Sequence, residues 1–317
     1  MNRNHSIDLF RGISVVLMVF FTLILKLSNS LIDVLNHNVS GSFHFGDLVL
    51  PFFIFASGLS LSYFFNKRKK LSNINFFLDI LYRIFILGII WVFISPFSSG
   101  MLFGMDEIAL ILVLFILLCP LIRLRDEYLL LISLILFMLY PILSYNIDFS
   151  YYLGGFYASI FYLPIILSGF AIGRSIINNT PIIKKVMLFS FILFIILFYL
   201  FPIDKMRASP SFMALSILLA SLLFHILYKY PIKNKILQYL GKNSLRYWVL
   251  MFVLFIIPVK LLYFSGVIPL PMQFSTIEAI FISLIFLVVF ALISYFIDIF
   301  TNFLSKKLNR LNQIKRS

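Results

Sequence analysis

Residues 13–25 read ISVVLMVFFTLIL, a run without a charged side chain that begins just after Arg11 and ends just before Lys26. The helix expected around this run, residues 9–27, has about the length that crosses a hydrocarbon core, roughly 20 residues. A basic start followed by an apolar run also opens a signal peptide, but no obvious small-residue cleavage site follows here. The run therefore predicts a first transmembrane helix.

Apolar runs of this kind recur along the whole chain. Hydrophobic residues make up 62% of the sequence and charged residues 12%, which excludes a fold that stays dissolved in water. No run shows the alternation of a membrane barrel, and backbone amides in lipid must bond within their own segment, so we expect helices. The sequence predicts an all-α, polytopic transmembrane helical bundle that forms a single membrane-embedded domain, residues 1–317. Its expected spans are residues 9–27, 47–65, 77–95, 107–122, 128–145, 155–174, 186–203, 210–229, 240–264 and 276–303.

The basic side chains indicate how this bundle sits in the membrane. Of the 26 Lys and Arg residues, all but Lys26, Lys205, Arg207 and Lys260 fall on one side when the expected spans alternate. Lys and Arg are retained in the cytoplasm, so we expect both termini there and the protein in the cell membrane. This topology accounts for the net charge of +14 without a nucleic-acid partner, although a basic inner face also attracts anionic membrane lipids or a phosphate-bearing cofactor.

The middle of each expected span carries no Asp, Glu, Lys or Arg. Ionisable groups at that depth are costly and mark proton or ion pathways, so this pattern counts against a proton-coupled transporter. It does not count against a transporter or flippase of a polar or lipid-linked molecule, which stays open as an alternative function. Candidate functional residues are therefore sought at helix ends and in loops.

The loop between the first two spans carries His37 and His44, and Asp47 follows it on the expected outer face. Imidazole titrates near neutral pH, so such a histidine can serve as a general base or carry an acyl group. Two histidines and an aspartate can also hold a metal, but the spacing of His37 and His44 matches no standard ligand pattern. We expect no metal, and ordinary interfacial polarity is the other interpretation of this loop.

Two segments near the N-terminus together resemble one family. Residues 6–13 read SIDLFRGI, and residues 46–55 read GDLVLPFFIF, followed by SGLSL at 57–61. They are similar to the opening of the heparan-α-glucosaminide N-acetyltransferase family, with its Asp-x-x-Arg-Gly first helix and its Asp-Leu-Val-Phe-Pro second helix. A looser likeness continues in LSGFAIGR at 167–174 and YLGKNSL at 239–245.

This resemblance implies a transmembrane acyltransferase that moves an acetyl group from cytosolic acetyl-CoA to an amino sugar on the far side of the membrane. It also implies a catalytic histidine ten residues before the Asp of Asp-Leu-Val, which is His37 in this sequence. Asp47 is expected to hold the tautomer and orientation of His37, although an Asp here also suits the start of a helix. Because the chain carries no lumenal domain, we expect a cell-surface sugar or a glycolipid, rather than heparan, as the acceptor.

Acetyl-CoA is expected to dock from the basic face, with its phosphates near arginines, since guanidinium groups suit bidentate phosphate recognition. The expected cofactor-binding residues are Arg11, Arg83, Arg174, Asn243 and Ser244. Positive-inside retention, or pairing within the membrane such as Asp79 with Arg83, is the other interpretation of the arginines. Asn243 and Ser244 can alternatively cap the start of the ninth span.

The chain departs from the family pattern at three places. It has Thr22 where Asn is common, Asp106-Glu107 where Gln-Arg is common and Met251 where His is common. These differences predict a changed substrate-facing site and leave a third interpretation, a catalytically degenerate member that serves as a structural or partner-binding membrane protein. A requirement for acetyl-CoA and for His37 separates the enzyme from both alternatives. Whether the chain forms a homo-oligomer stays open.

Overall fold

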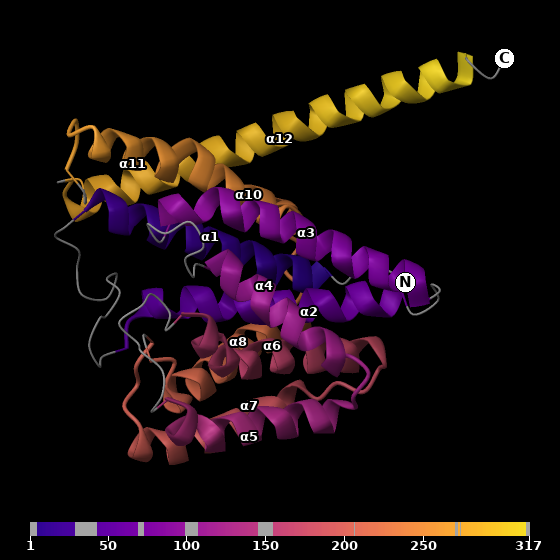
Figure 1. The fold of residues 1–317 in the computed structure, drawn as a ribbon, viewed down its shortest axis with the longest axis vertical. Coiled ribbons are helices and arrows are strands. Elements are labelled where there is room, and N and C mark those ends of the chain that lie inside the picture. The colour runs from indigo at the N-terminus through magenta and orange to yellow at the C-terminus, as the bar shows by residue number, and fades with distance from the viewer. Residues whose placement is uncertain are drawn as a thin grey trace.

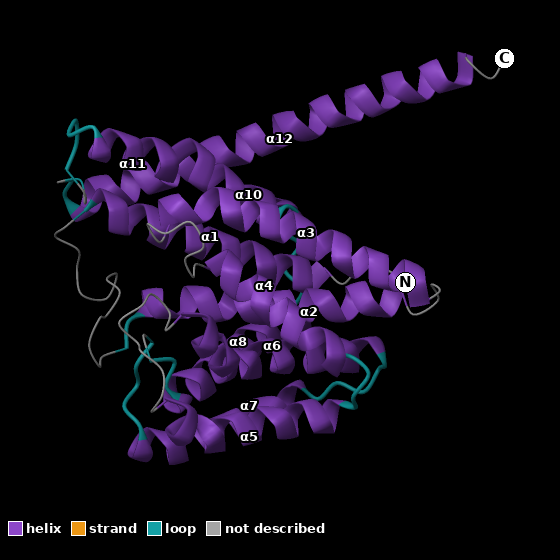
Figure 2. Cartoon of the chain, viewed as in Figure 1, coloured by secondary structure: helices purple, strands orange, loops and turns teal. Residues whose placement is uncertain are grey.

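The computed structural model describes residues 5–28, 43–68, 73–98, 107–144, 155–205, 207–269, 272 and 274–314. All regular structure in these residues is helical (Figure 2). Nine helices in this part of the chain are long and apolar enough to cross a membrane, and a shorter apolar helical segment covers Glu107–Leu121. The all-α, multi-pass architecture expected from the sequence is confirmed.

The helices follow one another in the order that the apolar runs predict. Their bounds are α1 His5–Leu27, η2 Phe45–Leu48, α2 Val49–Arg68, α3 Asn73–Ser98, α4 Glu107–Leu118, η3 Cys119–Leu121, α5 Asp126–Ser144, α6 Gly155–Ile177, α7 Ile183–Leu200, α8 Pro210–Lys229, α9 Lys235–Lys242, α10 Ser244–Met251, η5 Phe252–Ile256, α11 Ile257–Phe264 and α12 Thr276–Ile314. The expected span 240–264 differs at its start, because the short helix α9 ends first and the membrane-length segment begins at Ser244. Helix α12 continues past the expected 303 and runs out beyond the other helices (Figure 1).

Helices α1, α2, α6 and α8 form the centre of the bundle. In the most apolar stretches of α6 and α2, 83% and 72% of residues are buried, against 11% in α3 and 17% in α12. Helices α5 and α7 cover the centre on one side, and α10, α11 and α12 lie on the other (Figure 1). Large apolar side chains such as Phe85 and Phe281 point outward, as lipid-facing helices allow.

Small residues let α2 and α6 approach closely. A Cβ at Gly58 would overlap the backbone of α6, and a Cβ at Gly169 would overlap the Phe55 carbonyl of α2. In lipid the hydrophobic effect does not draw helices together, so the van der Waals contacts that such close backbone approach permits stabilise their packing. The contact fixes one face of α2 against the centre and turns the opposite face, with Ser57 and Ser60, toward α3 and α10.

A second close contact joins the N-terminal helix to a segment far along the chain. Helix α1 packs on α9, where a Cβ at Gly12 would overlap the Leu237 carbonyl and one at Gly241 would overlap the Asp8 carbonyl. Helix α9 is capped by Asn234, whose side chain accepts the Leu237 N–H at 3.0 Å. The start of α10 is thereby held beside the second turn of α1.

Candidate active site

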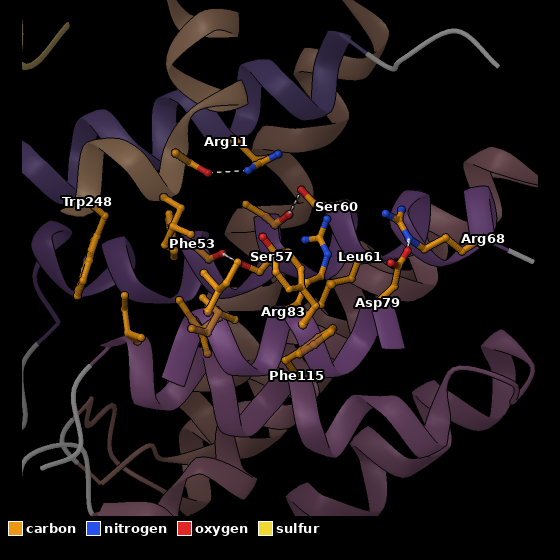
Figure 3. Close-up of a pocket in the computed structure, with 18 residues that line it drawn as sticks. Arg11, Phe53, Ser57, Ser60, Leu61, Arg68, Asp79, Arg83, Phe115 and Trp248 are labelled. Carbon is orange, nitrogen blue, oxygen red and sulfur yellow. Dashed lines mark hydrogen bonds and ion pairs between the residues drawn. The ribbon is translucent and has the colours of Figure 1, made fainter. Parts of the chain in front are cut away.

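A cavity of about 470 Å³ lies between α1, α2, α3, α4 and α10 (Figure 3). Its walls are mostly apolar, and its charged groups gather where α1 and α3 begin and α2 ends, which we call the basic end. The cavity is lined by Arg11, Phe53, Ala56, Ser57, Ser60, Leu61, Arg68, Asp79, Tyr82, Arg83, Ile86, Leu87, Ile108, Ile111, Phe115, Ser244, Leu245 and Trp248. Three of the five residues expected to bind a cofactor are among them.

Arg11 and Ser244 meet at this cavity although 233 positions separate them in the chain. The Arg11 guanidinium donates from Nη2 to Ser244 Oγ at 2.5 Å (Figure 3). The close packing of α1 on α9 places the two residues within reach, because Ser244 follows α9 directly. The Ser244 hydroxyl thus holds the Arg11 guanidinium at the basic end.

Arg68 and Arg83 bring two more guanidinium groups to the basic end. Their Cζ atoms lie 3.9 and 3.8 Å from the centre of the Phe64 ring, in cation–π contact. Asp79, one helical turn from Arg83, forms its ion pair with Arg68 instead (Figure 3). Among the described residues no carboxylate forms an ion pair with Arg83.

The rest of the cavity follows α2 from Leu61 to Phe53, a rise of about 12 Å at 1.5 Å per residue. The Ser57 and Ser60 hydroxyls face it, but they donate to the Phe53 and Ala56 carbonyls of their own helix. Apolar side chains of α4 and α10 complete the walls. The cavity is therefore cationic at one end and apolar along the remainder.

Asp47 lies at the other end of α2, in the turn η2, and is 1% exposed. Its Oδ2 accepts the His44 N–H at 3.0 Å, which shapes the entry into the helix. Its Oδ1 lies 3.4 Å from Nζ of Lys205, which comes from the loop between α7 and α8. Burial lowers the pKa of the Lys205 ammonium, and the Asp47 carboxylate opposes that shift. Asp47 thus both starts a helix and anchors a buried ion pair.

Two of the expected cofactor-binding residues do not line the cavity. Arg174 forms an ion pair with Asp126 and donates to the Ile122 carbonyl at 2.9 Å, which ties α6 to the start of α5. Asn243 lies between α9 and α10, and its amide donates to the Tyr239 carbonyl at 3.2 Å. Arg174 thus holds two helices together, and Asn243 caps the end of α9.

The expected catalytic histidine, His37, lies outside the described residues. Of the departures from the family pattern, Met251 is 1% exposed and packs in the apolar core with α1, and Glu107 lies near Lys205. In the described part of the chain, no three His, Cys, Asp or Glu side chains are grouped so that they could hold a metal ion.

Arg68 and Lys205 were not among the site residues expected from the sequence. Arg68 was expected in a basic loop, where retention in the cytoplasm explained it, but it forms the last residue of α2. Lys205 stood out as one of few basic residues on the other side of the expected topology, and that exception could have singled it out. Its partner was not evident, because Asp47 lies far away in the chain.

The fold and the cavity define a polytopic membrane protein with a pocket between its spans that is cationic at one end and apolar along its length. A family model described as heparan-alpha-glucosaminide N-acetyltransferase, catalytic, matches residues 3–179, which is more than half of the chain. The chain belongs to this family, and its fold and family identify a transmembrane acetyltransferase-like protein. No curated protein matches the sequence. The matched part contains Arg11, Arg83 and Asp47, whereas Ser244 and Lys205 lie beyond it.

Proposed function

We propose that this protein transfers an acetyl group from acetyl-CoA, bound from the cytoplasmic side, to a sugar amine or hydroxyl on the opposite side of the membrane. The observation that carries the proposal is the cavity, whose cationic end and apolar length suit a phosphate-bearing donor with a long, uncharged arm. The family supports the same reaction class.

The basic end supplies the groups that would hold the phosphates of the donor. Arg83 faces the cavity and has no carboxylate partner among the described residues, so its charge is available to an anion. Arg11 is held in place by Ser244, and a guanidinium whose geometry is fixed loses less freedom when it binds phosphate. Asp79 neutralises Arg68 in part, which limits repulsion among the three cations.

The apolar part of the cavity would guide the arm of the donor toward the Asp47 end. Residues of α2 line it as far as Phe53, and Ile108 of α4 lies at the same depth beside Glu107. The two serine hydroxyls of this wall donate within α2, and most of the other side chains along it are apolar, which would limit the access of water. Water exclusion protects a thioester from hydrolysis.

Bound acetyl-CoA would supply an acetyl thioester, whose C–S bond breaks as the acetyl carbon bonds to its acceptor, so that CoA leaves as a thiolate. In direct transfer, His37 takes the proton of the attacking amine or hydroxyl. In the two-step alternative, a ring nitrogen of His37 first takes the acetyl group, and the attack of the amine or hydroxyl then breaks that bond and releases the imidazole, which takes the proton. Asp47 holds the tautomer and orientation of His37 in either case. The family name points to an α-glucosaminide as the first acceptor to test, with cell-surface sugars and glycolipids next.

The test uses the full chain in nanodiscs. Acetyl-CoA and CoA should each raise its thermal stability, by about 2.7 kcal/mol at a hundredfold excess over Kd, because a ligand of the native state stabilises it by mass action. Labelled acetyl-CoA should then acetylate methyl α-glucosaminide. His37→Ala should abolish transfer and keep the stabilisation by CoA.

His44→Ala is the matched control for the histidine, and it should keep most of the transfer activity. A folded sample that shows no stabilisation at saturating acetyl-CoA and CoA would overturn the proposal and direct attention to transport or lipid movement. Full transfer activity in His37→Ala would remove His37 from the mechanism.

A further inference from the structure

Lys205 occupies an unusual place for a lysine. Its side chain is 12% exposed, and it pairs with Asp47, which is 1% exposed, across 3.4 Å. Taking two charges out of water costs several kcal/mol per ion, and apolar residues in their place often stabilise a fold at least as well. A buried pair of this kind calls for a role other than stability.

The loop that carries Lys205 is fixed from several sides. The Tyr162 hydroxyl donates to the Lys205 carbonyl at 3.2 Å, and the Tyr140 hydroxyl donates to the Arg207 carbonyl at 3.0 Å. Within the loop, the Asp204 N–H donates to Ser209 Oγ at 3.0 Å. Tyr140 and Tyr162 are both buried, so α5 and α6 hold the loop backbone rigidly against the bundle.

The pair also lies next to the apolar end of the cavity. Asp47 lies about 10 Å along the helix axis from the cavity residue Phe53, as estimated from the rise per residue. Glu107, whose charge acts on Lys205, is the neighbour of the cavity residue Ile108. The turn η2 before α2 and the start of α4 thus both place a carboxylate near Lys205.

We propose that Lys205 is a positioning residue for acetyl transfer, which holds the Asp47 carboxylate ionised and fixed in place; this inference rests on the proposed function. The His44 N–H engages one carboxylate oxygen and Lys205 the other, so both oxygens of the carboxylate are held.

The inference predicts a change in the pH dependence of transfer when the charge of Lys205 is removed. An opposite charge within about 4–6 Å favours the ionised form of a carboxylate, so Asp47 should take up a proton at higher pH in Lys205→Met. The acid limb of the pH–rate profile should move up by about one unit or more, and transfer at neutral pH should fall about tenfold to a hundredfold. The other titratable groups around the pair are unchanged in this variant: Glu107 on α4 acts on Lys205, and Tyr162 on α6 is close enough to feel the charges of Asp47 and Asp204.

Lys205→Arg keeps the charge, so its pH–rate profile should have the same acid limb as that of the unaltered protein. A purely structural role of Lys205 would not link the position of this limb to the charge of the side chain. Stabilisation by CoA should persist in both variants, because the arginines of the basic end are untouched. Lys260→Met, which removes another lysine from the same side of the bundle, is the matched control and should leave the profile unchanged. These assays use methyl α-glucosaminide as the acceptor.

A thermodynamic cycle tests the pairing without any activity. Lys205→Met alone leaves an unpaired buried carboxylate, whereas Lys205→Met with Asp47→Asn leaves none, so the double variant should be destabilised by less than the sum of the single changes. Additive losses in thermal stability together with an unmoved acid limb would overturn the inference. Absence of transfer in the unaltered protein would instead overturn the proposed function, and the cycle would still decide whether Lys205 holds Asp47.

Discussion

At the scale of single residues, binding of an anion at the site depends on which arginines already form ion pairs with carboxylates. Asp79 neutralises Arg68 and Asp126 neutralises Arg174, whereas Arg83 faces the cavity without a carboxylate partner among the described residues. The Phe64 ring holds the Arg83 guanidinium in place without consuming its hydrogen-bond donors. Arg83 is therefore the arginine on which binding of an anionic donor should depend most.

Arg83→Gln should weaken acetyl-CoA binding about tenfold to a hundredfold, since a hydrogen bond to a charged group contributes about 1.5–3 kcal/mol. Titration of thermal stability with acetyl-CoA measures the change. Arg125→Gln removes an exposed arginine just before α5, outside the cavity, and should bind like the unaltered protein. Equal weakening in both variants would mean that only the overall charge of this face matters.

At the scale of the elements, glycines decide where helices touch. Gly169 lets α6 approach the Phe55 carbonyl of α2, and Gly12 and Gly241 let α1 and α9 approach each other. These contacts position the cavity: the first turns Ser57 and Ser60 outward from the centre, and the second carries Ser244 to Arg11.

Gly169→Ala should lower the free energy of unfolding by about 1–3 kcal/mol, because an added methyl in a filled contact forces the helices apart. Gly88→Ala is the matched control, since a Cβ there meets nothing within 4 Å, and its stability should stay equal or rise slightly. Thermal unfolding in detergent compares the two variants. Equal stability of both would show that α2 and α6 can separate without cost.

At the scale of the whole molecule, the basic end of the cavity and the Lys205–Asp47 pair lie toward opposite ends of α2. The basic end should face the cytoplasm, since most Lys and Arg residues gather on that side, and the donor should enter there. A reaction across the membrane follows only if this orientation holds.

Cysteine labelling measures the orientation directly. In a Cys119→Ser background, Ser265→Cys after α11 should react with a membrane-impermeant maleimide on intact cells, and Lys233→Cys before α9 should react only after lysis. Both positions are exposed in the structure, so burial does not limit labelling. The opposite pattern would place the basic end outside and reverse the direction of the proposed transfer.

The sequence by itself determined the class of fold, and the types of its residues indicated candidates for the site. Long apolar runs admit only helices in lipid, so the helical fold and the order of the spans could be predicted, and the segments around Arg11 and Asp47 indicated the family. Of the ten expected spans, the one at 107–122 corresponds to an apolar segment shorter than the other nine in the described residues. The start of α10 was less clear, because the short helix α9 adjoins the apolar run and only the contact of Gly241 with α1 separates them in space.

Only the tertiary structure decided which residues act together. Arginine content alone predicted cofactor contacts for Arg83 and Arg174 alike, but packing of α6 on α5 pairs Arg174 with Asp126, while Arg83 reaches the cavity. Lys205 meets Asp47 because α7 and α8 return their connecting loop to the start of α2. Span patterns follow from local hydrophobicity along the chain, whereas a site depends on side chains brought together from distant helices, and a single sequence does not contain those distances.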